Sequence, residues 1–169
     1  MSHRIARTAL AAALTLAASA ACAATRTVVT YQTEAAPGTI VVKTAERRLY
    51  LVLGDGTALR YAVAVGRPGK QWQGAARVNG KHVLPAWTPP AEVRADNPAL
   101  PEVIPGGAPN NPMGVAAMTL SGGEYAIHGT NRPDSIGKSA SYGCIRMLND
   151  DIADLFERVA VGTQVVVLR

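Results

Sequence analysis

Apolar runs near the start of the chain predict a β-meander. Strands are expected at 39–43, 48–53 and 58–65, where Val, Leu and Tyr are concentrated. The Gly-Asp-Gly turn at 54–56 lies between the last two runs and is typical of a hairpin. The run at 27–31 is compatible with a preceding strand.

The second half of the chain combines a hairpin with a helix. Apolar runs at 115–120 and 124–128 flank a Ser-Gly-Gly turn, which predicts a second hairpin. Further on, spacing at i, i+3, i+4 and i+7 predicts one helical face made of Ile152, Leu155, Phe156 and Val159. Asn149 is the expected N-cap and Gly162 the expected end of this helix, and 163–169 is expected to form a closing strand.

The segment 68–112 has a different character. It contains nine of the eleven prolines, and proline disfavours central strands. We expect an ordered, irregular excursion with short strands, and its apolar anchors are Trp72, Val83, Trp87 and Ile104. Long irregular segments in a compact domain tend to be functional loops. The sequence thus predicts one mainly β domain with sandwich-like sheets, one main helix and a long Pro/Gly-rich loop region.

Residues 1–23 have the features of a secretory signal peptide. Arg4 and Arg7 precede an apolar stretch at 8–20, and Ala21-Cys22-Ala23 forms a small-residue cleavage site. We therefore expect an exported protein of the periplasm or cell envelope, with a short N-terminal segment at 24–37 and one folded domain at 38–169. The alternative is lipid attachment at Cys22, although Ser19 stands where such a motif normally has Leu.

The charge of the chain excludes few partners. Removing the signal peptide lowers the formal net charge from +5 to +3, because only Arg4 and Arg7 are lost. The remaining chain has no run of Lys or Arg, so nucleic-acid binding is not expected. No further segment is long and apolar enough to predict a transmembrane helix in the mature chain.

Cysteine and histidine usage directs attention to one stretch. After signal removal Cys144 is the sole cysteine, so it is either buried and inert, paired between molecules, or reactive. The remaining histidines are His82 and His128, and His82 is expected to be a surface or structural residue. The absence of a C-x-x-C motif and of metal-type spacing disfavours zinc, so no metal site is expected.

His128 and Cys144 have the spacing of a nucleophile and its base. His128 ends an apolar strand, and Cys144 follows Gly143 on the far side of a polar loop. A thiol needs a nearby base or cation to react well at neutral pH. The amides around Gly143 and Cys144 are candidate oxyanion donors, which points to acyl transfer through a thioester. The bare pair also fits a buried cysteine and a histidine that bonds only to backbone.

The motifs around this pair resemble those of the L,D-transpeptidases with a YkuD-type catalytic domain. Ile-His-Gly-Thr at 127–130 is followed, after a loop, by Ser-Tyr-Gly-Cys-Ile-Arg at 141–146. Ser-Ile-Gly at 135–137 and Asn-Pro-Met-Gly at 111–114 also look like the family. The resemblance covers most of residues 38–168.

The resemblance implies a mostly β catalytic domain that acts on peptidoglycan stem peptides. Cys144 would attack the carbonyl of the third stem residue and release the terminal D-Ala. The thioester would then pass to an amine: a second diaminopimelate, the lysine of a lipoprotein, or a D-amino acid. His128 would be general base and acid, held by the Gly129 carbonyl oxygen, and the site-ordering positions would be Ser141, Gly143 and Arg146. No cofactor is implied.

Two departures from the family pattern stand out. Many members carry His before Gly-Cys, where this chain has Tyr142. Many also carry Thr-Pro-x-Gly after the meander, where only Gly74 is equivalent here. The sequence leaves two alternatives open: an L,D-carboxypeptidase that resolves the same thioester with water, and a non-catalytic wall-binding domain.

Overall fold

A computed structural model describes residues 26–169 of the chain. The predicted signal peptide, its cleavage after Ala23 and the alternative lipid attachment at Cys22 lie outside these residues. Within the described part, no helix combines the length and the apolarity needed to cross a membrane.

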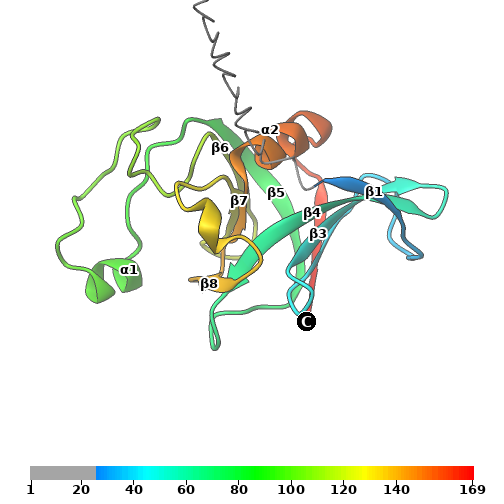
Figure 1. Cartoon of the computed structure of the whole chain (residues 1–169), viewed down its shortest axis with the longest axis horizontal. Coiled ribbons are helices and arrows are strands. Elements are labelled where there is room, and N and C mark those ends of the chain that lie inside the picture. The colour runs from blue at the N-terminus through cyan, green and yellow to red at the C-terminus, as the bar shows by residue number, and fades with distance from the viewer. Residues whose placement is uncertain (1–25) are drawn as a thin grey trace, which may run out of the picture.

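Ten strands, two α-helices and one 3-10 turn make up the described chain (Figure 1). In sequence order they are β1 Thr27–Thr30, β2 Ile40–Lys43, β3 Arg48–Gly54, β4 Thr57–Gly66, β5 Gly74–Val83, α1 Ala91–Asp96, β6 Ala116–Leu120, β7 Ala126–His128, η1 Pro133–Ser135, β8 Ser139–Ser141, β9 Ile145–Met147, α2 Asn149–Arg158 and β10 Gln164–Leu168. The strands predicted from hydrophobic pattern at 39–43, 48–53 and 58–65 are confirmed as β2, β3 and β4.

Eight of the strands close into a ring. The path runs β4-β3-β2-β10-β5-β6-β7-β9, and pairing of Val63 with Met147 and of Ala64 with Arg146 returns β9 to β4. The ring is mixed, because β10 runs parallel to β2 and β7 runs parallel to β9. The additional strands β1 and β8 pair with β4. The expected mainly β fold is confirmed, and its sheets form a closed barrel.

Alternate positions of the ring strands fill the barrel with apolar side chains. Ile40, Val42 and Leu49 are fully buried there, as are Ile127 and Ile145 on the strands beside the His/Cys motif. Residues next to these along each strand face the opposite side of the sheet. The outer face of β6, β7 and β9 is therefore the surface on which a site can form.

Helix α2 packs against β6 and β7. Ile152 and Leu155 are fully buried, as the helical spacing predicts. Both predicted helix ends need correction. Asn149 is the first helical residue and its side chain makes no cap hydrogen bond, and the helix ends at Arg158, before Gly162. Gly162 instead occupies the turn before β10, where its φ of 94° suits a residue without a Cβ.

The Pro-rich segment contains more regular structure than its composition predicts. Its first part forms the ten-residue strand β5, which pairs with β10 and β6 inside the ring. Val83 at the end of β5 is 70% exposed, so it is not an apolar anchor. The prolines are concentrated after this strand, in residues 84–112, which we term the excursion.

The excursion leaves the barrel and returns to its outer face (Figure 1). Trp87 and Ile104 exchange backbone hydrogen bonds of 2.8 Å across its base. The buried Asn111 side chain donates to the carbonyl oxygens of Pro85 and Pro105, at 2.9 Å each. The excursion is thus ordered by its own hydrogen bonds, as the sequence predicts.

Candidate active site

The parallel pairing of β7 with β9 brings the two sequence motifs together. His128 lies opposite Arg146, and Cys144 comes directly before β9. Ile127 and Ile145 point into the barrel, so His128 and Arg146 point to its outer face. There His128, Cys144 and Arg146 line one small cavity of about 70 Å³, together with Met113 of the returning chain.

The His128 imidazole is buried, with 4% of its surface exposed. Its Nδ1 lies 2.7 Å from the carbonyl oxygen of Gly129. A carbonyl can only accept, so Nδ1 carries the ring proton and Nε2 keeps its lone pair. Burial lowers the pKa of His128 to about 4, helped by the positive charge of Arg146 and opposed by the Gly129 and Pro112 carbonyls. The imidazole is therefore neutral at neutral pH.

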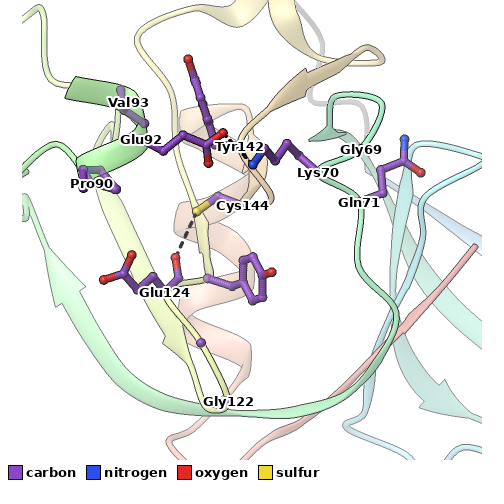
Figure 2. A pocket seen from close by; sticks show the side chains of 13 residues that line it. Gly69, Lys70, Gln71, Pro90, Glu92, Val93, Gly122, Glu124, Tyr142 and Cys144 are labelled. Carbon is purple, nitrogen blue, oxygen red and sulfur yellow. Dashed lines mark hydrogen bonds and ion pairs between the residues drawn. The ribbon is translucent and has the colours of Figure 1, made fainter. Parts of the chain in front are cut away.

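The Cys144 side chain is partly buried and lines the same small cavity as His128. Burial raises the pKa of the thiol, while the Ala126 amide and the charge of Arg146 act in the opposite direction. Its Sγ lies 3.9 Å from the carbonyl oxygen of Glu124 (Figure 2). With a raised thiol pKa and a lowered imidazole pKa, both side chains are neutral at rest.

The backbone before Cys144 is held in a conformation that only glycine adopts easily. Gly143 has a φ of 124°, and a Cβ there would come within 2.6 Å of the Tyr125 ring. Ser141 Oγ accepts from the Gly143 amide at 3.1 Å and donates to the Cys144 carbonyl oxygen at 2.6 Å. Trp72 Nε1 donates to the Gly143 carbonyl oxygen at 3.0 Å. The Gly143 amide is thus engaged inside the loop, which leaves the Cys144 amide as the candidate oxyanion donor.

The end of β7 is fixed by Asn149, a residue whose role at the site the sequence did not indicate. Its Oδ1 accepts from the Thr130 amide at 3.0 Å and from the Val115 amide at 3.4 Å. A Cβ on Gly129 would lie 2.3 Å from that oxygen, and one on Gly114 2.2 Å. These glycines make room for the Asn149 side chain beside His128.

Arg146 lies half-buried on the same face. Its Nε is buried and makes no hydrogen bond to any described residue. Burial lowers the pKa of its guanidinium, with the charge of Arg132 contributing. A cationic residue in the cavity wall suits an anionic group of a bound molecule.

A larger cleft of about 590 Å³ also reaches Cys144 (Figure 2). Its walls include Lys70, Glu92 and Glu124. Cys144 and Tyr142 line both cavities, so the thiol lies where the two meet. A chain-like substrate can therefore extend in two directions from this sulfur.

His82, the other histidine, lies one strand away from this site. It pairs with Ala117 on β6, which in turn pairs with His128 on β7. Its side chain is exposed, in agreement with the surface position predicted for it. Within residues 26–169 we find no cluster of three or more His, Cys, Asp or Glu side chains suited to a metal ion.

A family model and a curated relative both relate the chain to the same protein family. Residues 37–167 match the YkuD domain, described as an L,D-transpeptidase catalytic domain. The chain is 44% identical over 135 residues to "Probable L,D-transpeptidase YbiS" of Escherichia coli K12, which covers 75% of this chain and 43% of that protein. The chain therefore spans less than half the length of this relative.

Solved structures share the fold. An L,D-transpeptidase from Mycobacterium smegmatis superposes with a TM-score of 0.62 at 17% identity, over 78% of this chain and 58% of that one. A Brucella melitensis structure described as a probable carnitine operon oxidoreductase is 44% identical, with a TM-score of 0.56 over 85% and 92% of the two chains. The domain match over most of the chain decides the family. The chain belongs to the L,D-transpeptidase family with a YkuD catalytic domain, a family of cysteine transpeptidases.

Proposed function

We propose that the protein is a peptidoglycan L,D-transpeptidase with Cys144 as its nucleophile. The observation that carries the proposal is the placement of His128 at the end of β7 and of Cys144 directly before the paired strand β9, where both line one cavity. Peptidoglycan is the substrate because family membership points to it, and the protein would act at the cell envelope, where that polymer lies.

The first half-reaction forms a thioester. His128 takes the thiol proton through Nε2 while Sγ attacks the carbonyl carbon of the third stem residue. Gly129 supports this step because its carbonyl oxygen, 2.7 Å from Nδ1, stabilises the imidazolium that forms. The tetrahedral oxyanion accepts from the Cys144 amide, and Gly143 and Ser141 hold that amide in place. The bond to D-Ala then breaks, and His128 returns the proton to the leaving amine.

The second half-reaction transfers the acyl group. An acceptor amine attacks the thioester, the carbon–sulfur bond breaks, and the proton returns to the thiol through His128. The acceptor is a diaminopimelate of a second stem, a lipoprotein lysine or a D-amino acid. Arg146 supports binding of an anionic stem, because this positively charged residue lines the cavity. No step calls on a cofactor.

One assay tests the reaction. Purified protein is incubated with tetrapeptide muropeptides, and the products are separated and identified by mass spectrometry. Crosslinked dimers and released D-Ala are expected from the wild type, and none from Cys144→Ala or Cys144→Ser at unchanged circular dichroism. Shortened monomers without dimers would instead establish an L,D-carboxypeptidase, and binding without any product would establish a wall-binding domain.

A further inference from the structure

Helix α1 stands over the larger cleft without a hydrophobic anchor of its own. None of its six residues is buried. Packing of an apolar face normally supplies most of the stability of a helix in a protein, and a six-residue helix is marginal by itself. Other contacts must therefore fix α1 against the barrel.

Those contacts come from a set of five polar residues, which we term the α1 clamp. It comprises Glu92 and Asp96 on α1, Arg67 and Lys70 on the turn after β4, and Tyr142 two residues before Cys144. Lys70 Nζ lies 2.6 Å from Glu92 Oε1, as drawn in Figure 2, and Arg67 Nη2 lies 3.5 Å from the same oxygen. The clamp thus joins three segments that are far apart in sequence.

Tyr142 is the centre of the clamp. Its hydroxyl donates to Asp96 Oδ2 at 2.5 Å, and Arg67 Nη2 donates to the same oxygen at 3.1 Å. The Arg67 guanidinium also lies over the Tyr142 ring, 4.0 Å from its centre. These bonds lower the pKa of Asp96, with Tyr142 as the largest cause. An isolated exposed ion pair contributes little to stability, but here one carboxylate, one cation and one ring contact each other simultaneously.

What the clamp holds is the common wall of the two cavities. Pro90 and Val93, at the start of α1, line both the large cleft and the small His128 cavity. Cys144 lies between these cavities, so movement of α1 away from the barrel would widen the approach to the sulfur. The clamp residue nearest the nucleophile in sequence is also the one where many family members have His.

We propose that Tyr142 is a positioning residue that seats α1 over Cys144 through Asp96 and Arg67, and so sets the width of the substrate cleft. It acts through α1 and makes no contact with the reacting atoms. The effect on thiol access follows from the clamp alone, whereas the effect on stem-peptide binding also rests on the proposed function.

Thiol access is tested by alkylation of Cys144 with iodoacetamide, followed by intact mass. Tyr142→Phe keeps the ring under Arg67 and removes the bond to Asp96. Loss of one such hydrogen bond is expected to raise the alkylation rate about threefold to tenfold. Asp96→Ala removes the same acceptor and should raise the rate at least as much. The double variant should be no faster than Asp96→Ala alone, because both substitutions remove one and the same contact. Glu102→Gln, on an exposed part of the same excursion, is the control and should match wild type.

Turnover of the muropeptide tetrapeptide supplies the second measurement. Tyr142→Phe should raise KM about threefold to tenfold, as for the alkylation rate, and should leave kcat within twofold of wild type. Tyr142→His should return both the alkylation rate and KM to wild-type values, because its ring can donate to Asp96. The proposal would be overturned if the alkylation rate of Tyr142→Phe stayed within twofold of wild type. It would also be overturned if the effects of the two single substitutions on the alkylation rate added in the double variant. A lower kcat at unchanged KM and alkylation would also overturn it and assign the hydroxyl a direct role. Faster alkylation in a protein that never turns over muropeptides would support the clamp and refute the proposed function.

Discussion

Asn149 at the start of α2 accepts a hydrogen bond from the Thr130 amide at 3.0 Å, two residues beyond His128. One amide side chain thereby connects the helix to the strand end that presents the imidazole. The same oxygen reaches the Val115 amide, where the returning excursion meets β6. The position of His128 therefore depends on a residue that never contacts the nucleophile.

Removing this connection should slow the chemistry more than it weakens the fold. For Asn149→Ala we expect about 1–2 kcal/mol less stability to unfolding, since two backbone donors lose their partner. Small misplacements of a catalytic group cost on the order of tenfold to a hundredfold in rate. The rate is measured as acylation of Cys144 by a carbapenem, a β-lactam that serves as an acylating probe, and the covalent product is detected by intact mass spectrometry. Urea unfolding measures the stability. Asn149→Asp keeps the acceptor oxygen and should recover most of the rate. Equal rates in Asn149→Ala and wild type would contradict this role.

Replacing His128 should slow acylation of Cys144 without preventing substrate binding. General acid–base assistance of this kind contributes on the order of a hundredfold to ten-thousandfold. His128→Gln and His128→Ala are therefore expected to react that much more slowly with a carbapenem. His82→Ala is the matched control, because His82 lies on β5 and is separated from His128 on β7 by Ala117 of the intervening strand β6. Loss of acylation in His82→Ala alone would show that the wrong histidine has been assigned.

The acylation rate should stay nearly constant between pH 7 and pH 5. The pKa of His128 is lowered to about 4, so its Nε2 remains free to accept a proton across that range. It becomes protonated, and the rate falls, only as the pH approaches 4. A pre-formed thiolate as the reacting species would instead slow about tenfold per pH unit below the thiol pKa. Rates measured from pH 4 to pH 8 distinguish the two.

Burial of neutral His128 should also make folding stability depend on pH. The unfolded chain binds a proton near pH 6.5, whereas the folded chain resists it until about 4. The contribution is therefore fully present above pH 6.5 and is lost as the pH falls from 6.5 to 4, by about 3 kcal/mol at most. Urea unfolding at several pH values, compared between wild type and His128→Gln, isolates it. Parallel stability curves for the two proteins would contradict the burial of a neutral imidazole.

Export remains a prediction from the first residues of the chain. Positive charge, an apolar run and small residues follow one another in residues 1–23, so cleavage after Ala23 is expected. Expression of the full chain with N-terminal sequencing of the product measures the cleavage site. A diacylated Cys22 would establish the lipoprotein alternative, and an intact N-terminus on a cytoplasmic product would refute both.

Local patterns predicted those parts of the fold whose residues determine their own structure. The apolar runs at 39–43 and 48–53 correspond to strands that are buried on both faces, and the helical spacing of Ile152 and Leu155 corresponds to one buried helix face. Burial of these segments therefore left a local record in the sequence. The predicted N-cap was wrong because the side chain of Asn149 bonds to the distant Thr130 amide instead of capping its own helix. Competition of that kind depends on tertiary contacts and has no local signal.

The residues of the site could be predicted from sequence motifs, but their contacts in space could not. Cys144 and His128 were identified from their spacing and from the family resemblance, and their pairing follows from β7 lying beside β9. The clamp made by Tyr142, Asp96 and Arg67 could not be predicted, because these residues come from three separate segments. Strand β5 was missed because its small residues and glycines resemble those of a loop, and only its pairing with β10 and β6 makes it regular.

The position of β10 in the ring has a consequence for the order of assembly. This strand is the last of the barrel along the chain, yet it lies between β2 and β5. Without β10, strand β2 of the early meander and strand β5, which leads to the strands of the two motifs, have no strand to pair with between them. A chain emerging from the ribosome therefore cannot complete the ring until residue 168 is available, and contacts so distant in sequence make folding slow. During synthesis the nascent barrel thus stays open between β2 and β5 until this last strand has been added.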